Sequence, residues 1–133
     1  MYQQKRNKRR AGYQIKKTSS KDINIDRQIW VLHYAMVEKL LKHPELADTV
    51  RQTLIKRQES GRLRHSEYIT WESLLMIMDE PELFRRGVLE DSEKMRKYRR
   101  RTPFVGILTE AERQAALDAD AIGELKDMDY FLG

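Results

Sequence analysis

The sequence predicts an all-α protein, a compact bundle of four to six short helices with flexible N- and C-terminal ends. Apolar residues recur at intervals of three and four, and helix-capping residues precede several of these stretches. Hydrophobic residues make up 40% of the 133 positions, enough for a modest core, while 35% of the positions are charged. Cysteine is absent, so the fold cannot depend on disulfide bonds.

The central helix is expected at about residues 27–42. Asp26 is expected to cap its first turn, with Ile25 and Trp30 forming a hydrophobic staple across that turn. Two adjacent apolar rows make a wide face for burial, and they consist of Ile29, Leu32, Met36 and Leu40 and of Trp30, Tyr34, Val37 and Leu41.

A second helix is expected to start at Pro44 and to end at Ser60, with Gly61 in the left-handed conformation. Residues 61–69 are then expected to be a polar connection. Thr70 is expected to cap a third helix. The buried stripe of that helix comprises Trp71, Leu74, Leu75 and Met78.

Pro81 is expected to start a short helix, and Asp91-Ser92 to cap a basic helix that ends before Pro103. The apolar run 104–108 has no room for a helix, so we expect it to cross the core in extended form. Thr109 and Glu112 match the capping-box pattern, which predicts a last helix at about 110–118.

Charge is divided along the chain into blocks of opposite sign. Residues 1–21 carry +8, residues 22–93 carry −4, residues 94–101 carry +6 and residues 110–133 carry −5. Segregation of this kind is typical of interaction tails and patches. It predicts three regions: a basic disordered arm (1–22), a helical domain (23–118) and an acidic, partly disordered tail (119–133).

No membrane or export signal is expected. No stretch approaches the ~20 apolar residues of a membrane span. The basic N-terminus leads into no apolar region of a secretory signal. We therefore expect a cytoplasmic protein.

The sequence predicts neither a metal site nor a cofactor. His33, His43 and His65 are too widely spaced to present two ligands from one helix or loop. The glycines follow no phosphate-binding pattern. Structural or surface roles are expected for His33 and His43.

Two basic clusters are the strongest candidates for contact with a nucleic-acid backbone. One or two cations suffice to offset the dipole at the end of a helix, but the 94–101 helix carries six. An alternative of equal weight is that this helix is simply solvated, with some of its basic side chains paired with nearby carboxylates. The candidate nucleic-acid-binding residues are Lys5, Arg6, Lys8, Arg9 and Arg10 in the arm, and Arg96, Lys97, Arg99, Arg100 and Arg101 in the helix.

The acidic tail carries apolar residues at near-helical spacing, as expected of a segment that folds into a groove on a protein partner. Docking on its own domain and disorder are the favoured alternatives. The candidate partner-binding residues are Ile122, Leu125, Met128 and Phe131.

These observations favour a non-enzymatic binding protein, a small regulator that contacts nucleic acid through basic clusters and a protein through its acidic tail. This layout is similar to that of bacterial antitoxins. One alternative is a protein–protein adaptor that binds no nucleic acid. Another is a small metal-independent ribonuclease, because the 62–68 loop combines Arg, His, Glu and Tyr. The sequence does not predict an oligomeric state.

Overall fold

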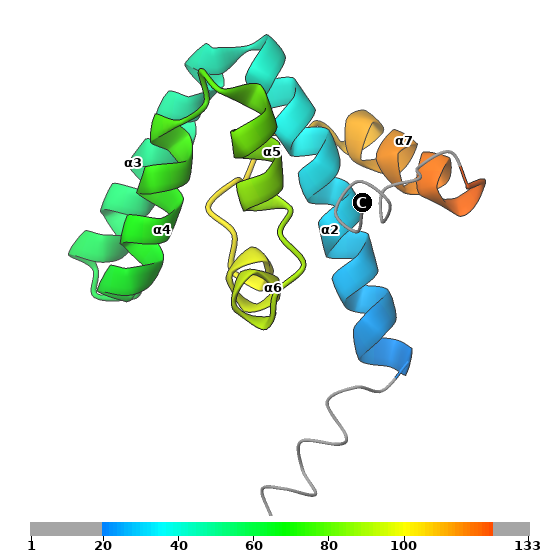
Figure 1. Cartoon of the computed structure of the whole chain (residues 1–133), viewed down its shortest axis with the longest axis horizontal. Coiled ribbons are helices and arrows are strands. Elements are labelled where there is room, and N and C mark those ends of the chain that lie inside the picture. The colour runs from blue at the N-terminus through cyan, green and yellow to red at the C-terminus, as the bar shows by residue number, and fades with distance from the viewer. Residues whose placement is uncertain (1–19, 124–133) are drawn as a thin grey trace, which may run out of the picture.

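The computed structural model describes residues 20–123. Within this range the chain forms six α-helices and one short 3-10 helix, with no strand (Figure 1). The predicted all-α bundle is therefore confirmed. Most of the predicted arm and tail, residues 1–19 and 124–133, lie outside the described residues.

The long helix α2, Ser20–Lys42, contacts α5, α6 and α7 (Figure 1). It begins six residues before the predicted cap at Asp26, so that prediction and the staple with Ile25 were wrong. Asp26 lies inside the helix, and its carboxylate accepts a hydrogen bond of 2.8 Å from Arg100. Asp22 stands in the true first turn, where a negative charge favours the positive end of the helix dipole.

A helical hairpin follows. It consists of η1, Pro44–Leu46, α3, Ala47–Glu59, and α4, His65–Met76. Gly61 has a φ of 75°, as predicted for the residue after the end of a helix.

The start of α4 corrects the prediction of a polar connection over 61–69. Thr70 lies inside this helix, where its hydroxyl donates to the carbonyl of Ser66. Leu63, Glu67, Trp71 and Leu75 are all buried and recur every four residues, which explains why the helix starts early.

Helices α5, Pro81–Val88, and α6, Glu93–Arg100, pack against α2, and α5 also contacts α4 (Figure 1). A β-carbon at Gly87 would overlap the side chain of Leu74, so a residue without one lets α5 and α4 approach closely. The hydroxyl of Ser92 accepts a hydrogen bond from the backbone N–H of Met95. The predicted cap at Asp91-Ser92 is thus confirmed, with Ser92 as the capping residue of α6.

The apolar run 104–108 forms a turn, and the prediction of an extended crossing was wrong. Phe104 and Ile107 are buried, whereas Val105 is exposed and Gly106 has a φ of 79°. A left-handed residue bends the backbone and lets two of the apolar side chains reach the core on either side of it.

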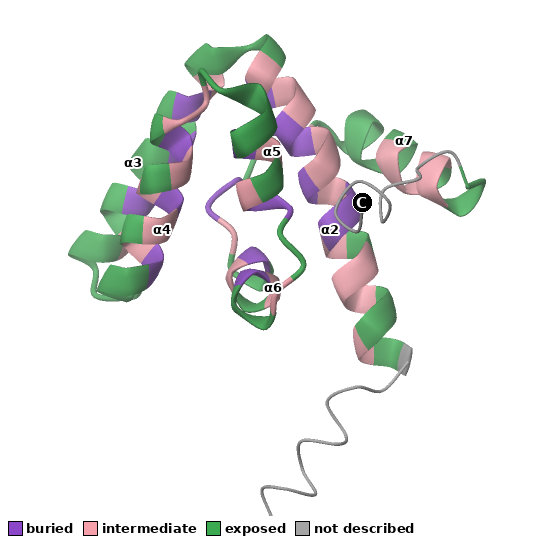
Figure 2. Cartoon of the chain, in the orientation of Figure 1, coloured by how far each residue is buried: buried purple, intermediate pink, exposed green. Residues whose placement is uncertain are grey.

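The last described helix is α7, Glu110–Ala121, and it packs on α2 on the side away from the α3–α4 hairpin (Figure 1). Both hydrogen bonds of the capping box between Thr109 and Glu112 are present, as predicted. The helix runs three residues further than expected. None of its residues is fully buried (Figure 2).

The core is aromatic where α2, α4 and the turn after α6 meet. The ring of Phe104 lies 5.6 Å from that of His33 and 5.2 Å from that of Trp71, measured between centroids. All three side chains are buried. In Figure 2 the buried positions line the inner sides of α2, α4 and α6, so one continuous core joins the hairpin to the central helix.

Candidate nucleic-acid interface

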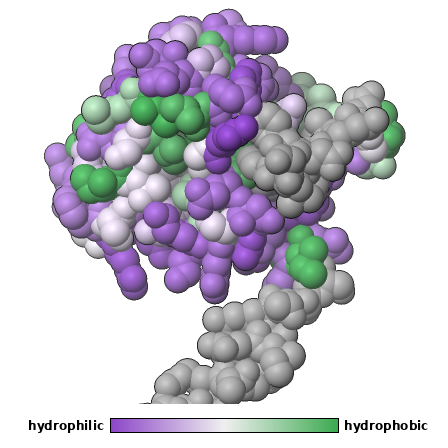
Figure 3. All heavy atoms as spheres, in the orientation of Figure 1, coloured by the Kyte–Doolittle hydropathy of each residue, from purple (hydrophilic) through white to green (hydrophobic). Residues whose placement is uncertain are grey.

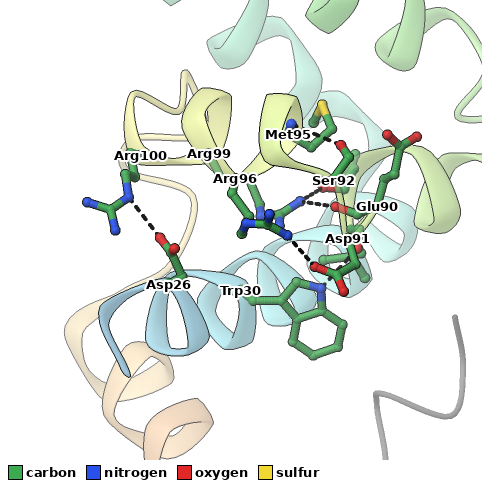
Figure 4. A network of polar contacts seen from close by, with 11 residues as sticks. Asp26, Trp30, Glu90, Asp91, Ser92, Met95, Arg96, Arg99 and Arg100 are labelled. Atoms are coloured by element: carbon green, nitrogen blue, oxygen red, sulfur yellow. Dashed lines mark hydrogen bonds and ion pairs between the residues drawn. The ribbon is translucent and has the colours of Figure 1, made fainter. Parts of the chain in front are cut away.

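Three arginines of the predicted basic helix form ion pairs with carboxylates of the chain itself. Arg96 lies 2.6 Å from Asp91, and Arg100 lies 2.8 Å from Asp26 (Figure 4). Arg101 lies 3.0 Å from the carboxylate of Glu67 on α4. Much of the positive charge in α6 therefore has an internal partner, as in the alternative that the sequence left open.

Arg99 belongs to the interior. Its side chain is buried, and one guanidinium nitrogen donates to the carbonyls of Val88 and Glu90, each at 2.9 Å (Figure 4). The indole of Trp30 donates to the carbonyl between them, that of Leu89, at 3.0 Å. Burial lowers the pKa of Arg99 to about 10. Arg99 and Trp30 thus satisfy three consecutive carbonyls at the end of α5, and Arg99 is not presented to an outside ligand.

Lys97 has the opposite environment from Arg99. It is exposed, and no carboxylate within residues 20–123 pairs with it. Lys97 and Arg101 are four residues apart, at the end of α6, which places the two side chains on the same side of that segment.

The end of α6 meets a second basic segment, at the turn between α3 and α4. A guanidinium nitrogen of Arg57, at the end of α3, donates to the carbonyl of Arg101 at 2.7 Å. Burial lowers the pKa of Arg57, and the neighbouring charges of Arg62 and Arg101 lower it further, partly offset by Glu67. The three guanidinium groups are thus close enough to affect one another electrostatically.

We call this surface the basic edge, and define it as Arg57, Arg62, Arg64, Lys97 and Arg101. Arg62 and Arg64 are exposed and, like Arg57 and Lys97, form no ion pair within the described part of the chain. Glu67 is the carboxylate that faces this group, paired with Arg101 through one oxygen. The margin below α4 and α6 is hydrophilic in Figure 3. The arrangement leaves surplus positive charge beside a partly buried arginine, which suits an anion with several negative groups.

Arg57, Arg62 and Arg64 were missed as interface residues in the sequence. Their distance from α6 along the chain, about 40 residues, hides a proximity that only the packing of α4 creates. A signal was nevertheless present, because the four-residue spacing of Leu63, Glu67 and Trp71 places Glu67 on the buried face of a helix. A buried carboxylate calls for a basic partner elsewhere.

Some of the predicted binding residues lie outside the part of the chain that the structure describes. The arm residues Lys5, Arg6, Lys8, Arg9 and Arg10 are outside the described residues. Of the predicted partner-binding residues, Ile122 directly follows α7 with 72% of its surface exposed. The other three, Leu125, Met128 and Phe131, are outside the described range, so both surfaces remain predictions.

The side chains of the 62–68 segment lie in different environments. His65 is exposed at the start of α4, while Glu67 is buried and held by Arg101. The hydroxyl of Tyr68 donates to the carboxylate of Glu72.

His33 occupies a structural position, with Nδ1 2.8 Å from the carbonyl of Ile29. Within residues 20–123, no group of three His, Asp or Glu side chains is arranged to hold a metal ion. None of the helices in the same range has the length and apolar content of a membrane span.

Comparisons of the chain with protein-family models, with curated proteins and with solved structures found no match.

Proposed function

We propose that this protein is a small non-enzymatic regulator that binds the phosphate backbone of a nucleic acid through the basic edge. The observation that carries the proposal is the hydrogen bond from Arg57 to the carbonyl of Arg101, which joins two basic segments into one surface. The proposal moves the binding surface from the whole of α6 to the place where α6 meets the α3–α4 turn.

Electrostatics support an anionic ligand at this surface. Arg57, Arg62 and Arg101 contribute three positive charges, and Glu67 contributes one negative charge. The charged form of Arg57 is disfavoured by burial and by its basic neighbours. A phosphate beside these groups would offset that unfavourable energy, since arginine presents a planar set of donors that matches phosphate oxygens.

The proposed binding mode is independent of base sequence. Arginine and lysine contacts to phosphates position a protein on a nucleic acid but do not distinguish its bases. Such binding weakens steeply as salt is added, because each neutralised phosphate releases condensed counterions. We therefore expect affinity for both DNA and RNA at low ionic strength, with little preference between sequences.

The experiment is a fluorescence-anisotropy titration of labelled duplex DNA and single-stranded RNA at several salt concentrations. The test variant is Arg62→Gln combined with Lys97→Gln. Both side chains are exposed and neither holds another residue's charge, so the fold is preserved. Arg57 and Arg101 are left unchanged, because substitution of Arg101 would strand the buried carboxylate of Glu67.

The matched control is Lys42→Gln combined with Arg86→Gln, which removes two exposed charges away from the basic edge. The test variant should bind more weakly, and the slope of log affinity against log salt should fall by roughly 0.7–0.9 for each phosphate contact removed. The control should keep the parent slope. Equal losses in the two variants, or no binding by the parent at low salt, would contradict the proposal.

A further inference from the structure

A second surface, at the corner between α4 and α5, combines exposed apolar side chains with free carboxylates. Met76 is 72% exposed and Leu83 is 50% exposed. Asp79 and Glu80, in the connection between the two helices, are exposed as well. Figure 3 shows a hydrophobic area over α4 and α5. We call this surface the α4–α5 patch, and define it as Met76, Asp79, Glu80 and Leu83.

The backbone under the patch is held by hydrogen bonds. The N–H of Glu80 donates to the carbonyl of Ile77 at 2.9 Å, and the N–H of Phe84 donates to the carbonyl of Glu80 at 3.0 Å. Pro81 restricts the backbone at the start of α5. The exposed side chains therefore project from a fixed frame, as a preformed docking surface requires.

The negative charge of the patch is not neutralised by its surroundings. Arg85 pairs with Glu38 at 2.7 Å and with Glu82 at 3.4 Å. In the part of the chain that the structure describes, Asp79 and Glu80 have no ion pair. A ligand for the patch should thus bring apolar side chains together with positive charge.

The chain itself contains a segment of that chemistry. Residues 1–19 carry seven Lys or Arg residues and no Asp or Glu, together with the apolar groups Tyr2, Tyr13 and Ile15. We infer that this N-terminal segment docks on the α4–α5 patch of its own chain. Tyr2 would cover Met76 and Leu83, and the cations between Lys5 and Arg10 would lie beside Asp79 and Glu80.

The segment is long enough to reach the patch. The ion pair of Arg85 with Glu38 places α5 beside the second half of α2, about 27 Å along the helix axis from Ser20. Residues 2–10 precede Ser20 by 18 to 10 residues, which span up to roughly 60 to 35 Å when extended, whereas the residues from Tyr13 onward are too near Ser20 to reach the patch. Attachment to the same chain also supplies a high local concentration, so a small and partly electrostatic contact suffices.

The inference is independent of the proposed function, since the patch and the basic edge share no residue. The arm was predicted from the sequence to contact nucleic acid. If both contacts exist, a nucleic acid competes with the α4–α5 patch for the same cations.

The experiment uses the full chain with Ala11→Cys, which is then its only cysteine and carries a nitroxide spin label. Paramagnetic broadening of backbone amide signals reports which part of the folded domain the arm approaches. We expect selective broadening of residues 76–83 that decreases with salt, because ionic strength screens exposed charges. Molecules that carry the spin label but no isotope enrichment are then mixed with enriched molecules that carry no spin label. The enriched molecules should show no such broadening, because the arm docks on its own chain.

The test variant combines Met76→Ser, Asp79→Asn and Glu80→Gln, all at exposed positions, and should lose the broadening at 76–83. The matched control combines Ile122→Ser, at the same 72% exposure as Met76, with Glu59→Gln and Glu93→Gln, and should retain it. Core amide signals unchanged in both variants show that they fold. Docking within the chain is refuted if residues 76–83 are not broadened in the parent, or if their broadening persists in the test variant. Broadening in the mixture also refutes it, because that result indicates docking on a second copy.

Discussion

The imidazole of His33 accepts a hydrogen bond of 2.8 Å from the hydroxyl of Thr102, which links the middle of α2 to the segment after α6. The other ring nitrogen of His33 faces the carbonyl of Ile29, which can only accept, so that nitrogen carries the proton. The oxygen of Thr102 in turn accepts from the N–H of Phe104 at 3.1 Å. This chain of bonds needs a neutral His33.

We predict that acid destabilises the fold through His33. Burial lowers the pKa of this side chain from 6.5 to about 4. Between these values the unfolded chain binds a proton that the folded chain does not. The contribution of His33 to the free energy of unfolding is therefore fully present above pH 6.5. It falls by about 3 kcal/mol as the pH is lowered to 4. Urea unfolding at a series of pH values measures it.

His33→Gln should flatten the dependence on pH between 4 and 6.5, although it also lowers stability throughout. His43→Gln is the control, because His43 is exposed and lies outside the core. It should keep the slope of the parent. A parent slope that survives in His33→Gln would assign the acid sensitivity to other groups.

Thr102→Val should destabilise the protein by roughly 1–3 kcal/mol. Valine keeps the shape of threonine but leaves a nitrogen of His33 and the N–H of Phe104 without their partner. Thr102→Ser keeps the hydroxyl and should lose much less. Thermal and urea unfolding of the two variants make the comparison, and equal losses would show that the methyl group of Thr102 matters more than its hydroxyl.

Arg99→Met should lower the free energy of unfolding by about 2–4 kcal/mol, because the buried carbonyl of Val88 and the partly buried carbonyl of Glu90 lose their donor. Lys97→Met, two residues away on an exposed site, should stay within about 0.5 kcal/mol of the parent. Urea unfolding distinguishes the two. A fully stable Arg99→Met protein would mean that this arginine is not needed to hold the turn after α5.

Gly106→Ala should cost about 1–2 kcal/mol through the backbone alone. The residue has a φ of 79°, and a β-carbon there would meet no atom within 4 Å. Gly106→Asn should cost less, since asparagine tolerates this conformation better than alanine. A stability unchanged in Gly106→Ala, measured by thermal unfolding, would show that the 104–108 turn relaxes to another conformation.

The elements that the sequence predicted well are those with a local cause. The capping box at Thr109, the cap at Ser92 and the left-handed Gly61 each depend on a few neighbouring residues. The start of α4 was missed because residues 61–69 look polar. Glu67 in this segment is nevertheless buried on the inner face of α4, where it pairs with Arg101, a residue far away in the chain.

The sequence by itself determined the all-α class, the caps at Ser92 and Thr109 and the division of charge into blocks, since these follow from residue type and spacing along a few turns. Only the tertiary structure decided which cations remain free. Arg99 and Lys97 are two residues apart on one basic helix, yet one is buried against carbonyls and the other faces solvent. The reason is physical: the energy of a charge depends on what surrounds it in space, and residues far away in the chain supply those surroundings.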